Sequence, residues 1–220
     1  MIASELISYD IPPLKLSDTG AKALDWMEEF KTSELPVVDA NNYVGLISES
    51  EVLDRNNIDD AIKSYNLLFK KPSVQENQHL FEIISLIVQY DINILPVIDK
   101  NEQYLGVVTS KKIIQYLAQV VSVAEAGSIL TIEVNVKDYS LAEISRMVES
   151  DDANILASFI TSHKDSNKLE VTLKINKTEI SRILHTFERF NYTVLASYNE
   201  SEYHKDLHDR YDEFMRFLNP

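Results

Sequence analysis

Apolar and polar residues follow two different patterns along this 220-residue chain, and the change falls near Gly127. Before Gly127, apolar residues at helical spacing alternate with short strand-like runs, and this arrangement occurs twice. After Gly127, runs of alternating apolar and polar residues are separated by amphipathic helical stretches. We therefore predict two domains, residues 1–126 and residues 127–200, followed by a C-terminal helix over residues 201–220.

Two hairpins of nearly equal sequence define the repeat in the first domain. LPVVDANNYVGLIS, residues 35–48, is followed by LPVIDKNEQYLGVVT, residues 95–109. Apolar residues at helical spacing precede each hairpin: Ala23, Leu24, Met27 and Phe30 in the first copy, and Ile83, Ile84, Ile87 and Tyr90 in the second. A further helix follows each hairpin. The repeated unit, helix–strand–strand–helix, predicts two packed copies of one module, at about residues 11–55 and 72–120.

Proline and glycine occupy the same places in both hairpins. Pro36 and Pro96 lie near the start of a strand, where a missing N–H is tolerated. Gly45 and Gly106 lie in the middle of the following strand, where glycine usually marks close approach by another backbone or by a ligand. From the sequence, both explanations of these glycines remain open.

Two further predictions concern the ends of these helices and the linker. Ser17 and Asn77, at equivalent positions, are good N-cap residues, and we expect them to open the first helix of each copy. Residues 54–72 link the copies, and the apolar stretch Leu67–Phe69 within them is expected to dock on the protein.

The second domain reads as β-α-β-β-α-β. SILTIEVNV and KLEVTLKI alternate, with Ile132, Val134 and Val136 on one face of the first. SLAEISRMV and TEISRILHTFERF are amphipathic, and NILASFITS and YTVLASY complete the strands. This order is the split βαβ arrangement of ferredoxin-like domains, so the predicted fold is α/β in the first domain and α+β in the second.

Composition narrows the classes of protein. The net charge is −14 and the only clustered cations are Lys70–Lys71 and Lys111–Lys112, which argues against a nucleic-acid binder. Cysteine is absent, which excludes disulfides and thiolate chemistry. No secretory signal is visible, and the most apolar run, LFEIISLIVQY, is too short to span a bilayer. We expect a cytoplasmic protein that does not act in a membrane.

The duplicated hairpins also carry a family resemblance. With LPVVD and YVGLIS in one copy and LPVID and YLGVVT in the other, residues 11–120 resemble a tandem pair of CBS domains, the Bateman module. The resemblance implies two copies packed face to face with clefts at their seam. It also implies a regulatory role in which an adenosine-containing ligand, such as AMP, ADP or ATP, binds in a cleft.

The signature of that family implies which residues meet the ligand. It consists of Gly, two apolar residues, Ser or Thr, two variable residues and Asp; the hydroxyl contacts phosphate and the Asp accepts from the ribose. The matching residues are Gly45, Ser48 and Glu51 in the first copy, and Gly106, Thr109 and Lys112 in the second. The strand residues Leu35, Pro36, Leu95 and Pro96 complete the predicted ligand-binding set.

Neither copy has the Asp of the signature, and the replacements differ in chemistry. Glu51 keeps a carboxylate that can accept from a ribose, whereas the ammonium of Lys112 only donates and suits a phosphate. We therefore expect an adenosine ligand in the Ser48/Glu51 cleft, and an anion or nothing beside Lys112. The sequence SESE, residues 48–51, is also a capping box, so capping alone and capping with ligand contact are both open.

The second domain resembles an ACT domain through VNVKDYSLAEI, with Asp138 at the head of the loop, and through Ala153–Ile155 at the start of the next strand. A CBS pair followed by an ACT-like domain is similar to bacterial proteins of the acetoin-utilisation protein B type. The resemblance implies amino-acid binding or dimerisation. Tyr139–Ser140 replaces the usual Pro-Gly of the ligand loop, which favours dimerisation because a backbone without glycine approaches a small ligand less freely.

Other kinds of site have less support in the sequence. His204, His208 and Asp212 share one face of the last predicted helix at metal-ligand spacing, but such a face is more often only solvated, and we predict no metal site. An apolar stripe on the same helix (Tyr203, Leu207, Tyr211, Phe214 and Leu218) suits packing on its own domain or a coiled-coil seam. With four glycines in the chain, there is neither a nucleophile elbow nor a glycine-rich phosphate loop.

These observations give two leading hypotheses for function. The first is a non-catalytic regulatory protein that binds an adenosine nucleotide in its CBS pair and signals through a homodimer, with a regulated protein as a further partner. The second is a scaffold of CBS and ACT-like domains that has lost its ligands and only assembles partners. An enzyme is disfavoured because no catalytic constellation is visible.

Overall fold

The computed structural model describes residues 1–65, 71–163 and 166–199. The chain divides into two compact units, Met1–Tyr116 and Leu117–Pro220. This division lies within helix α4 (Ser110–Val120), and the first strand of the second unit begins at Ser128, next to the predicted boundary residue Gly127. The predictions for Leu67–Phe69 and for residues 201–220, including the histidine pair and the apolar stripe, lie outside the described residues.

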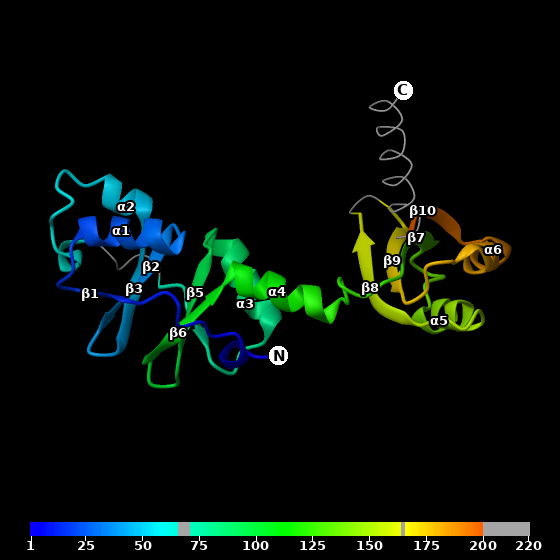
Figure 1. Ribbon diagram of the computed structural model, residues 1–220, viewed down its shortest axis with the longest axis horizontal. Helices are drawn as coiled ribbons and strands as arrows, with labels where there is room; N and C mark the ends of the chain where they lie inside the picture. Colours follow the sequence, from blue (N-terminus) through cyan, green and yellow to red (C-terminus); the bar gives the residue numbers. More distant parts are fainter. Residues whose placement is uncertain (66–70, 164–165, 200–220) are drawn as a thin grey trace, which may run out of the picture. The chain divides into compact units, whose positions relative to one another are not determined.

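Both copies of the repeat have the same order of elements, strand–helix–strand–strand–helix (Figure 1). The first copy contains β1 (Leu14–Lys15), α1 (Gly20–Phe30), β2 (Glu34–Asp39), β3 (Asn42–Ser48) and α2 (Glu49–Leu53). The second contains β4 (Val74–Gln75), α3 (Leu80–Tyr90), β5 (Ile94–Ile98), β6 (Tyr104–Thr109) and α4. Short 3-10 helices, Ala3–Glu5 and Ile62–Ser64, precede and follow the first copy. The predicted hairpins are confirmed, whereas β1 and β4 were not predicted.

Each copy forms a three-stranded sheet, in the orders β1-β2-β3 and β4-β5-β6. The short first strand runs parallel to the second, and the hairpin strands are antiparallel. Both hairpins contain a β-bulge at the same place, opposite Val37 and Val38 in one copy and opposite Val97 and Ile98 in the other. The signature glycines pair with Val37 and Val97, so each glycine lies at the bulge.

The predicted N-caps are wrong by two residues in both copies. Thr19 caps α1, because its Oγ1 accepts from the N–H of Lys22 at 3.2 Å, and His79 caps α3, because its Nδ1 accepts from the N–H of Phe81 at 3.3 Å. Ser17 and Asn77 lie instead in the turn between the short strand and the helix. The unpredicted strands β1 and β4 require this turn, which delays the start of each helix.

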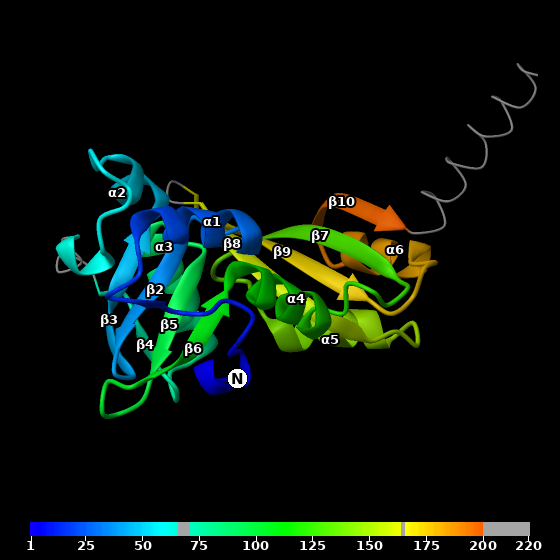
Figure 2. The ribbon, with the colours of Figure 1, turned by 60° about the vertical axis from the view of Figure 1, so that its left-hand side comes forward.

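The two copies are joined backbone to backbone at their hairpin tips. The N–H of Tyr104 donates to the carbonyl of Asn41 at 2.8 Å, and the N–H of Tyr43 donates to the carbonyl of Glu102 at 3.3 Å. Strands β2 and β5 also contact each other, and Figure 2 shows the two sheets side by side. One hydrophobic core contains buried side chains of both copies, so the copies pack as a single unit.

The second unit is a four-stranded antiparallel sheet in the order β10-β7-β9-β8. Its elements are β7 (Ser128–Asn135), α5 (Leu141–Glu149), β8 (Ile155–Ser162), β9 (Lys168–Ile175), α6 (Ser181–Arg189) and β10 (Thr193–Asn199). Both helices cover one face, where Ile132 and Phe187 are fully buried in a common core (Figure 1). The expectation that Val136 shares this face is wrong, because β7 ends at Asn135 and Val136 is exposed.

Candidate functional site

The signature residues of the first copy form a capping box at the start of α2. The N–H of Glu51 donates to Ser48 Oγ at 3.3 Å, and Glu51 Oε2 accepts from the N–H of Ser48 at 2.8 Å. The same carboxylate oxygen accepts from Ser48 Oγ at 2.9 Å. The capping function predicted for SESE is therefore confirmed, and one oxygen of Glu51 is engaged twice within its own helix end.

The signature residues of the second copy lie at the start of α4 and border a pocket. The N–H of Lys112 donates to Thr109 Oγ1 at 3.1 Å, the same cap that Ser48 provides in the first copy. Lys112 stands at the position of Glu51 and has no carboxylate with which to close this cap. The pocket has a volume of about 380 Å³ and is lined by Ile7, Ser8, Tyr9, Asp10, Thr109, Lys111, Lys112 and Gln115.

The opposite wall of this pocket comes from the N-terminal segment, residues 7–10. Ser8 forms an antiparallel bridge with Val107, in which the N–H of Ser8 donates to the Val107 carbonyl at 2.7 Å and the N–H of Val107 donates back at 3.3 Å. The segment therefore adds to the edge of β6. Sequence reasoning missed it because residues 7–10 precede the repeat and show no strand-like period of their own.

Gly106 is the residue that lets this segment approach. Its φ is +151°, and a Cβ at this position would lie 2.5 Å from Ile7 Cγ2 and 3.2 Å from the Ser8 carbonyl oxygen. Of the two explanations left open for this glycine, the structure shows close approach by another backbone. Gly106 therefore shapes the pocket indirectly, because it leaves space for the segment that contains Ser8 and Asp10.

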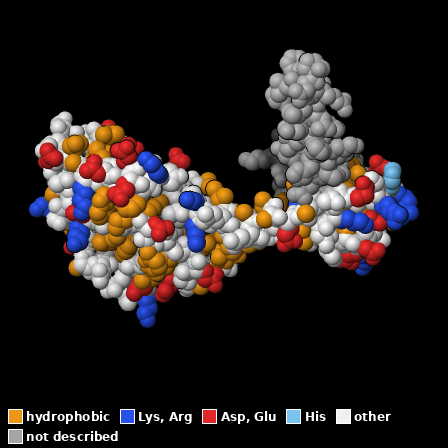
Figure 3. All heavy atoms as spheres, viewed as in Figure 1, with side chains coloured by type: hydrophobic (Ala, Val, Ile, Leu, Met, Phe, Trp, Pro, Cys, Tyr) orange, Lys and Arg blue, Asp and Glu red, His pale blue; other side chains and the backbone are white. Residues whose placement is uncertain are grey.

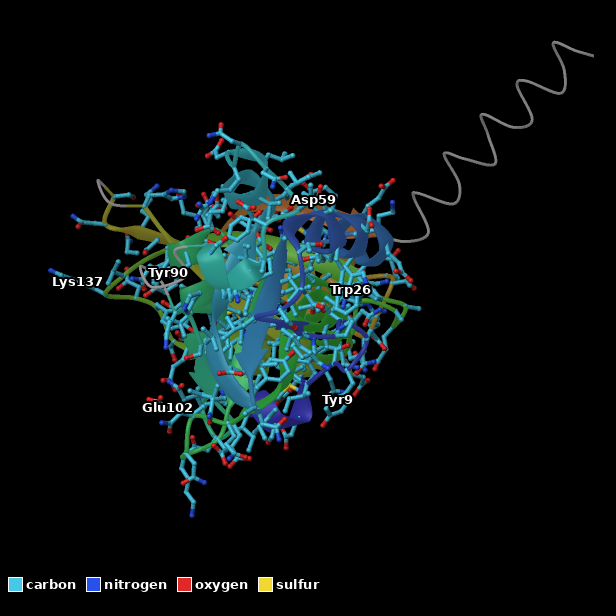
Figure 4. All side chains as sticks on the ribbon, turned by 90° about the vertical axis from the view of Figure 1, so that its left-hand side faces the viewer. Tyr9, Trp26, Asp59, Tyr90, Glu102 and Lys137 are labelled. Carbon is cyan, nitrogen blue, oxygen red and sulfur yellow. The ribbon has the colours of Figure 1, made fainter. Side chains whose placement is uncertain are left out.

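The acidic residue of the pocket is Asp10. Its Oδ2 accepts from Ser8 Oγ at 2.9 Å, and its N–H donates to the same Ser8 oxygen at 3.3 Å. These bonds orient the carboxylate from within its own segment. Tyr9, next to it, is 79% exposed and projects from the surface of the first unit (Figure 4). The structure thus brings together a hydroxyl, a carboxylate, an aromatic ring and two lysines, of which only Thr109 and Lys112 were predicted.

The remaining predicted site residues lie in the strands behind the signature positions. Leu35 and Leu95 are fully buried, and Pro36 and Pro96 are buried within β2 and β5, opposite Leu46 and Val107. None of the four lines the 380 Å³ pocket. In the structure, these four residues belong to the sheets that position the signature residues.

A buried carboxylate connects the two copies near these strands. Glu34 at the start of β2 is only 7% exposed, and its Oε2 accepts from the N–H of Asn93 at 3.2 Å. Burial raises the pKa of this carboxyl, and the negative charge of Asp91 raises it further. At the equivalent position, sixty residues on, the second copy has the apolar Ile94. The two copies therefore differ in charge at their seam.

The second unit contains a pocket of about 360 Å³ beside the loop that begins at Asp138. Three carboxylates line it, and the structure engages each of them: Glu133 with Lys168 at 2.5 Å, Asp138 with Asn135 at 3.0 Å, and Glu143 with the Tyr192 hydroxyl at 3.4 Å. Burial raises the pKa of Tyr192, and Glu143 adds to that effect. Among the described residues, no group of His, Asp and Glu is arranged to hold a metal ion.

Comparison with protein families identifies the class of the first unit. The CBS domain model matches residues 3–56 and 65–119, so this part of the chain is a tandem CBS domain pair. Such pairs are regulatory, nucleotide-sensing modules. The match begins at residue 3 and therefore includes the N-terminal wall of the pocket. In the part of the chain that the structure describes, no helix has the length and apolar character that crossing a bilayer requires.

Several known proteins are similar to part of this chain. The chain is 28% identical over 116 residues to inosine-5'-monophosphate dehydrogenase of Methanocaldococcus jannaschii, spanning 51% of this chain and 23% of that enzyme. It spans 52% of a second curated relative, from Thermofilum pendens. A CBS domain pair/ACT domain protein from Thermotoga maritima is similar in structure, with 21% identity, a TM-score of 0.48, and coverage of 54% of this chain and 98% of that one. CBSX2 in complex with AMP is 22% identical, with a TM-score of 0.46 and coverage of 54% and 97%.

Proposed function

We propose that this protein is a non-catalytic sensor of the cytoplasm that binds an adenosine-containing nucleotide, such as AMP, ADP or ATP, in its CBS pair and signals through a homodimer. The observation that carries the proposal is the pocket between residues 7–10 and 109–115. It places the signature hydroxyl of Thr109 beside cations and a carboxylate, which are the groups that a ribose-phosphate needs. A protein regulated by this sensor is the further partner that the proposal implies.

The electrostatics of the first unit support a small anionic ligand. On the face of this unit in Figure 3, acidic and basic side chains are interspersed. An extended nucleic acid draws most of its affinity from a continuous basic surface, whereas a mononucleotide needs only a local pair of cations. Lys111 and Lys112 provide such a pair at the pocket.

We assign the second unit to the ferredoxin-like, ACT-like class, with dimerisation as its role. The β-α-β-β-α-β order and the sheet order β10-β7-β9-β8 support this assignment. The open face of the sheet exposes Ile129, Phe159 and Tyr198, which suits a protein contact. The carboxylates of the nearby pocket are already paired within the unit, which argues against a dedicated amino-acid site.

A ligand-free scaffold remains the second candidate, and one observation favours it. Neither copy has the Asp of the family signature, and the replacement Glu51 is engaged in its capping box. A scaffold would use the CBS pair only to hold partners together. The two candidates differ in whether the folded protein binds a nucleotide at all.

Thermal-shift measurements separate these candidates. The full chain is heated with AMP, ADP, ATP, NAD, S-adenosylmethionine or free amino acids, each at concentrations far above micromolar. A ligand that binds only the folded state raises Tm, by an amount that grows with ligand concentration. A concentration-dependent rise with an adenine nucleotide supports the sensor; the same Tm with every compound supports the scaffold.

A further inference from the structure

We infer that the nucleotide occupies the cleft of the second copy, with Asp10 accepting from its ribose hydroxyls and Lys111 and Lys112 binding its phosphates. The inference rests on the proposed nucleotide binding and assigns it to one cleft, one set of residues and one class of ligand. It reverses the expectation from the sequence, which favoured the Ser48/Glu51 cleft because the second copy lacked an acceptor for the ribose.

Asp10 supplies that missing acceptor from outside the repeat. The carboxylate lines the same pocket as Thr109 and is oriented by Ser8, whose hydroxyl donates to Oδ2 at 2.9 Å. A carboxylate has about four acceptor positions, so this bond leaves room for two ribose hydroxyls. In the first copy, the carboxylate of Glu51 accepts two bonds within its own helix end, so it has fewer acceptor positions left than Asp10 has.

The charges in this pocket are unpaired within the described part of the protein. The ion pairs found among residues 1–65, 71–163 and 166–199 involve neither Asp10 nor Lys111 nor Lys112, although all three line one pocket of about 380 Å³. Because the carboxylate of Asp10 and the two ammonium groups line one pocket without forming an ion pair, there is space between them. A ligand that is a hydrogen-bond donor at one end and an anion at the other fits this space.

The two lysines define the ligand class as phosphorylated. An ammonium acts as a point charge toward phosphate, and two adjacent ammoniums favour a di- or triphosphate over an uncharged nucleoside. The same cations disfavour S-adenosylmethionine, whose sulfonium carries positive charge. Tyr9, with its ring exposed beside Asp10, offers a flat surface against which an adenine base can stack.

Calorimetric titration of the full chain with ATP, adenosine and 2′,3′-dideoxy-ATP tests each contact. Asp10→Asn is expected to weaken ATP binding about tenfold or more, through loss of charged hydrogen bonds, and to leave dideoxy-ATP binding nearly unchanged. Lys112→Gln is expected to weaken ATP and dideoxy-ATP alike and to leave adenosine unchanged. Matched controls are Asp59→Asn and Lys100→Gln, which change exposed side chains outside the pocket.

Three results would overturn the inference. If Asp10→Asn weakens the binding of ATP and of dideoxy-ATP equally, the carboxylate does not accept hydrogen bonds from the ribose. If Glu51→Ala abolishes ATP binding while Asp10→Asn and Lys112→Gln bind normally, the nucleotide occupies the first copy, and the proposed function survives without the inference. If no adenine nucleotide binds the wild-type chain, the inference fails together with the proposed function.

Discussion

The carboxylate of Glu34 accepts a hydrogen bond from the backbone N–H of Asn93 at 3.2 Å and thereby connects the two CBS copies inside a largely apolar seam. A backbone N–H satisfies only part of a carboxylate's hydrogen-bonding capacity, so the charged form is poorly solvated there. This explains the raised pKa of Glu34 and predicts that the stability of the seam depends on pH.

Glu34→Gln is predicted to stabilise the protein at neutral pH. Because the pKa of Glu34 is raised in the folded state, the folded protein binds its proton more tightly than the unfolded chain does. The contribution of protonated Glu34 to the stability of the folded state is complete below the ordinary carboxyl pKa. It is lost as pH rises through the raised pKa of the folded state. Glutamine keeps an acceptor for Asn93 without a charge. Thermal unfolding from pH 4 to pH 8 should show a higher Tm for Glu34→Gln at the upper end and a flatter pH profile.

Glu29→Gln, which changes an exposed side chain on α1, is the control for that experiment. It should leave the pH profile of the wild type intact. A profile for Glu34→Gln that matches the wild type would show that the buried carboxylate does not govern the pH dependence.

Ser48→Ala is predicted to destabilise the first unit by about 1 kcal/mol, the usual cost of removing an N-cap side chain. Its hydroxyl accepts from the N–H of Glu51 and donates to the carboxylate of Glu51, and both bonds are lost in the variant, whereas the bond from the backbone N–H of residue 48 to Glu51 can remain. Urea unfolding measures the change. Ser4→Ala, at an exposed position with no side-chain hydrogen bond among the described residues, should cost much less; equal costs would mean that the cap contributes nothing.

Gly106→Ala is predicted to detach the N-terminal segment from β6. The new Cβ would lie 2.5 Å from Ile7, and a residue other than glycine is strained at a φ of +151°, a cost of about 1–3 kcal/mol. Hydrogen exchange at the N–H of Ser8, which donates to Val107, should accelerate strongly. Ile7→Ala in the same chain removes the overlap and should restore part of the protection. Unchanged exchange in Gly106→Ala would show that the segment does not depend on this glycine.

The chain is predicted to be a homodimer in solution. The open face of the second sheet exposes apolar side chains, among them Phe159 and Tyr198, and such a face suits association between copies. Light scattering coupled to size exclusion at micromolar concentration should give twice the mass of one chain. A mass of one chain throughout the concentration range contradicts the prediction.

The sequence predicts the hairpins and the second sheet well, because a long alternating run or an internal repeat remains recognisable when single residues depart from it. It misses β1 and β4 because two residues, such as Leu14–Lys15, are too few to show a period. The errors in the predicted N-caps have the same cause: the sequence predicts that Ser17 starts the helix, whereas Ser17 belongs to the turn after β1. Each of these errors is local and leaves the order of the larger elements unchanged.

The pocket could be predicted only in part, for a different reason. Thr109 and Lys112 follow from the family signature, which runs along one continuous stretch of chain. Asp10 reaches the same pocket through the pairing of Ser8 with Val107, a contact between residues far apart in sequence. No spacing rule within a single copy encodes such a contact.

The pairing of Ser8 with Val107 also matters for anyone who recombines CBS modules. A chimera made by exchanging residues 72–120 for those of another protein would contain the foreign signature but retain the wall formed by residues 7–10, which pairs with β6 of this protein. The natural cassette for transplanting the second cleft is therefore discontinuous: it comprises the first ten residues together with the second copy. Exchange along the apparent repeat boundary would combine a foreign β6 with the native residues 7–10.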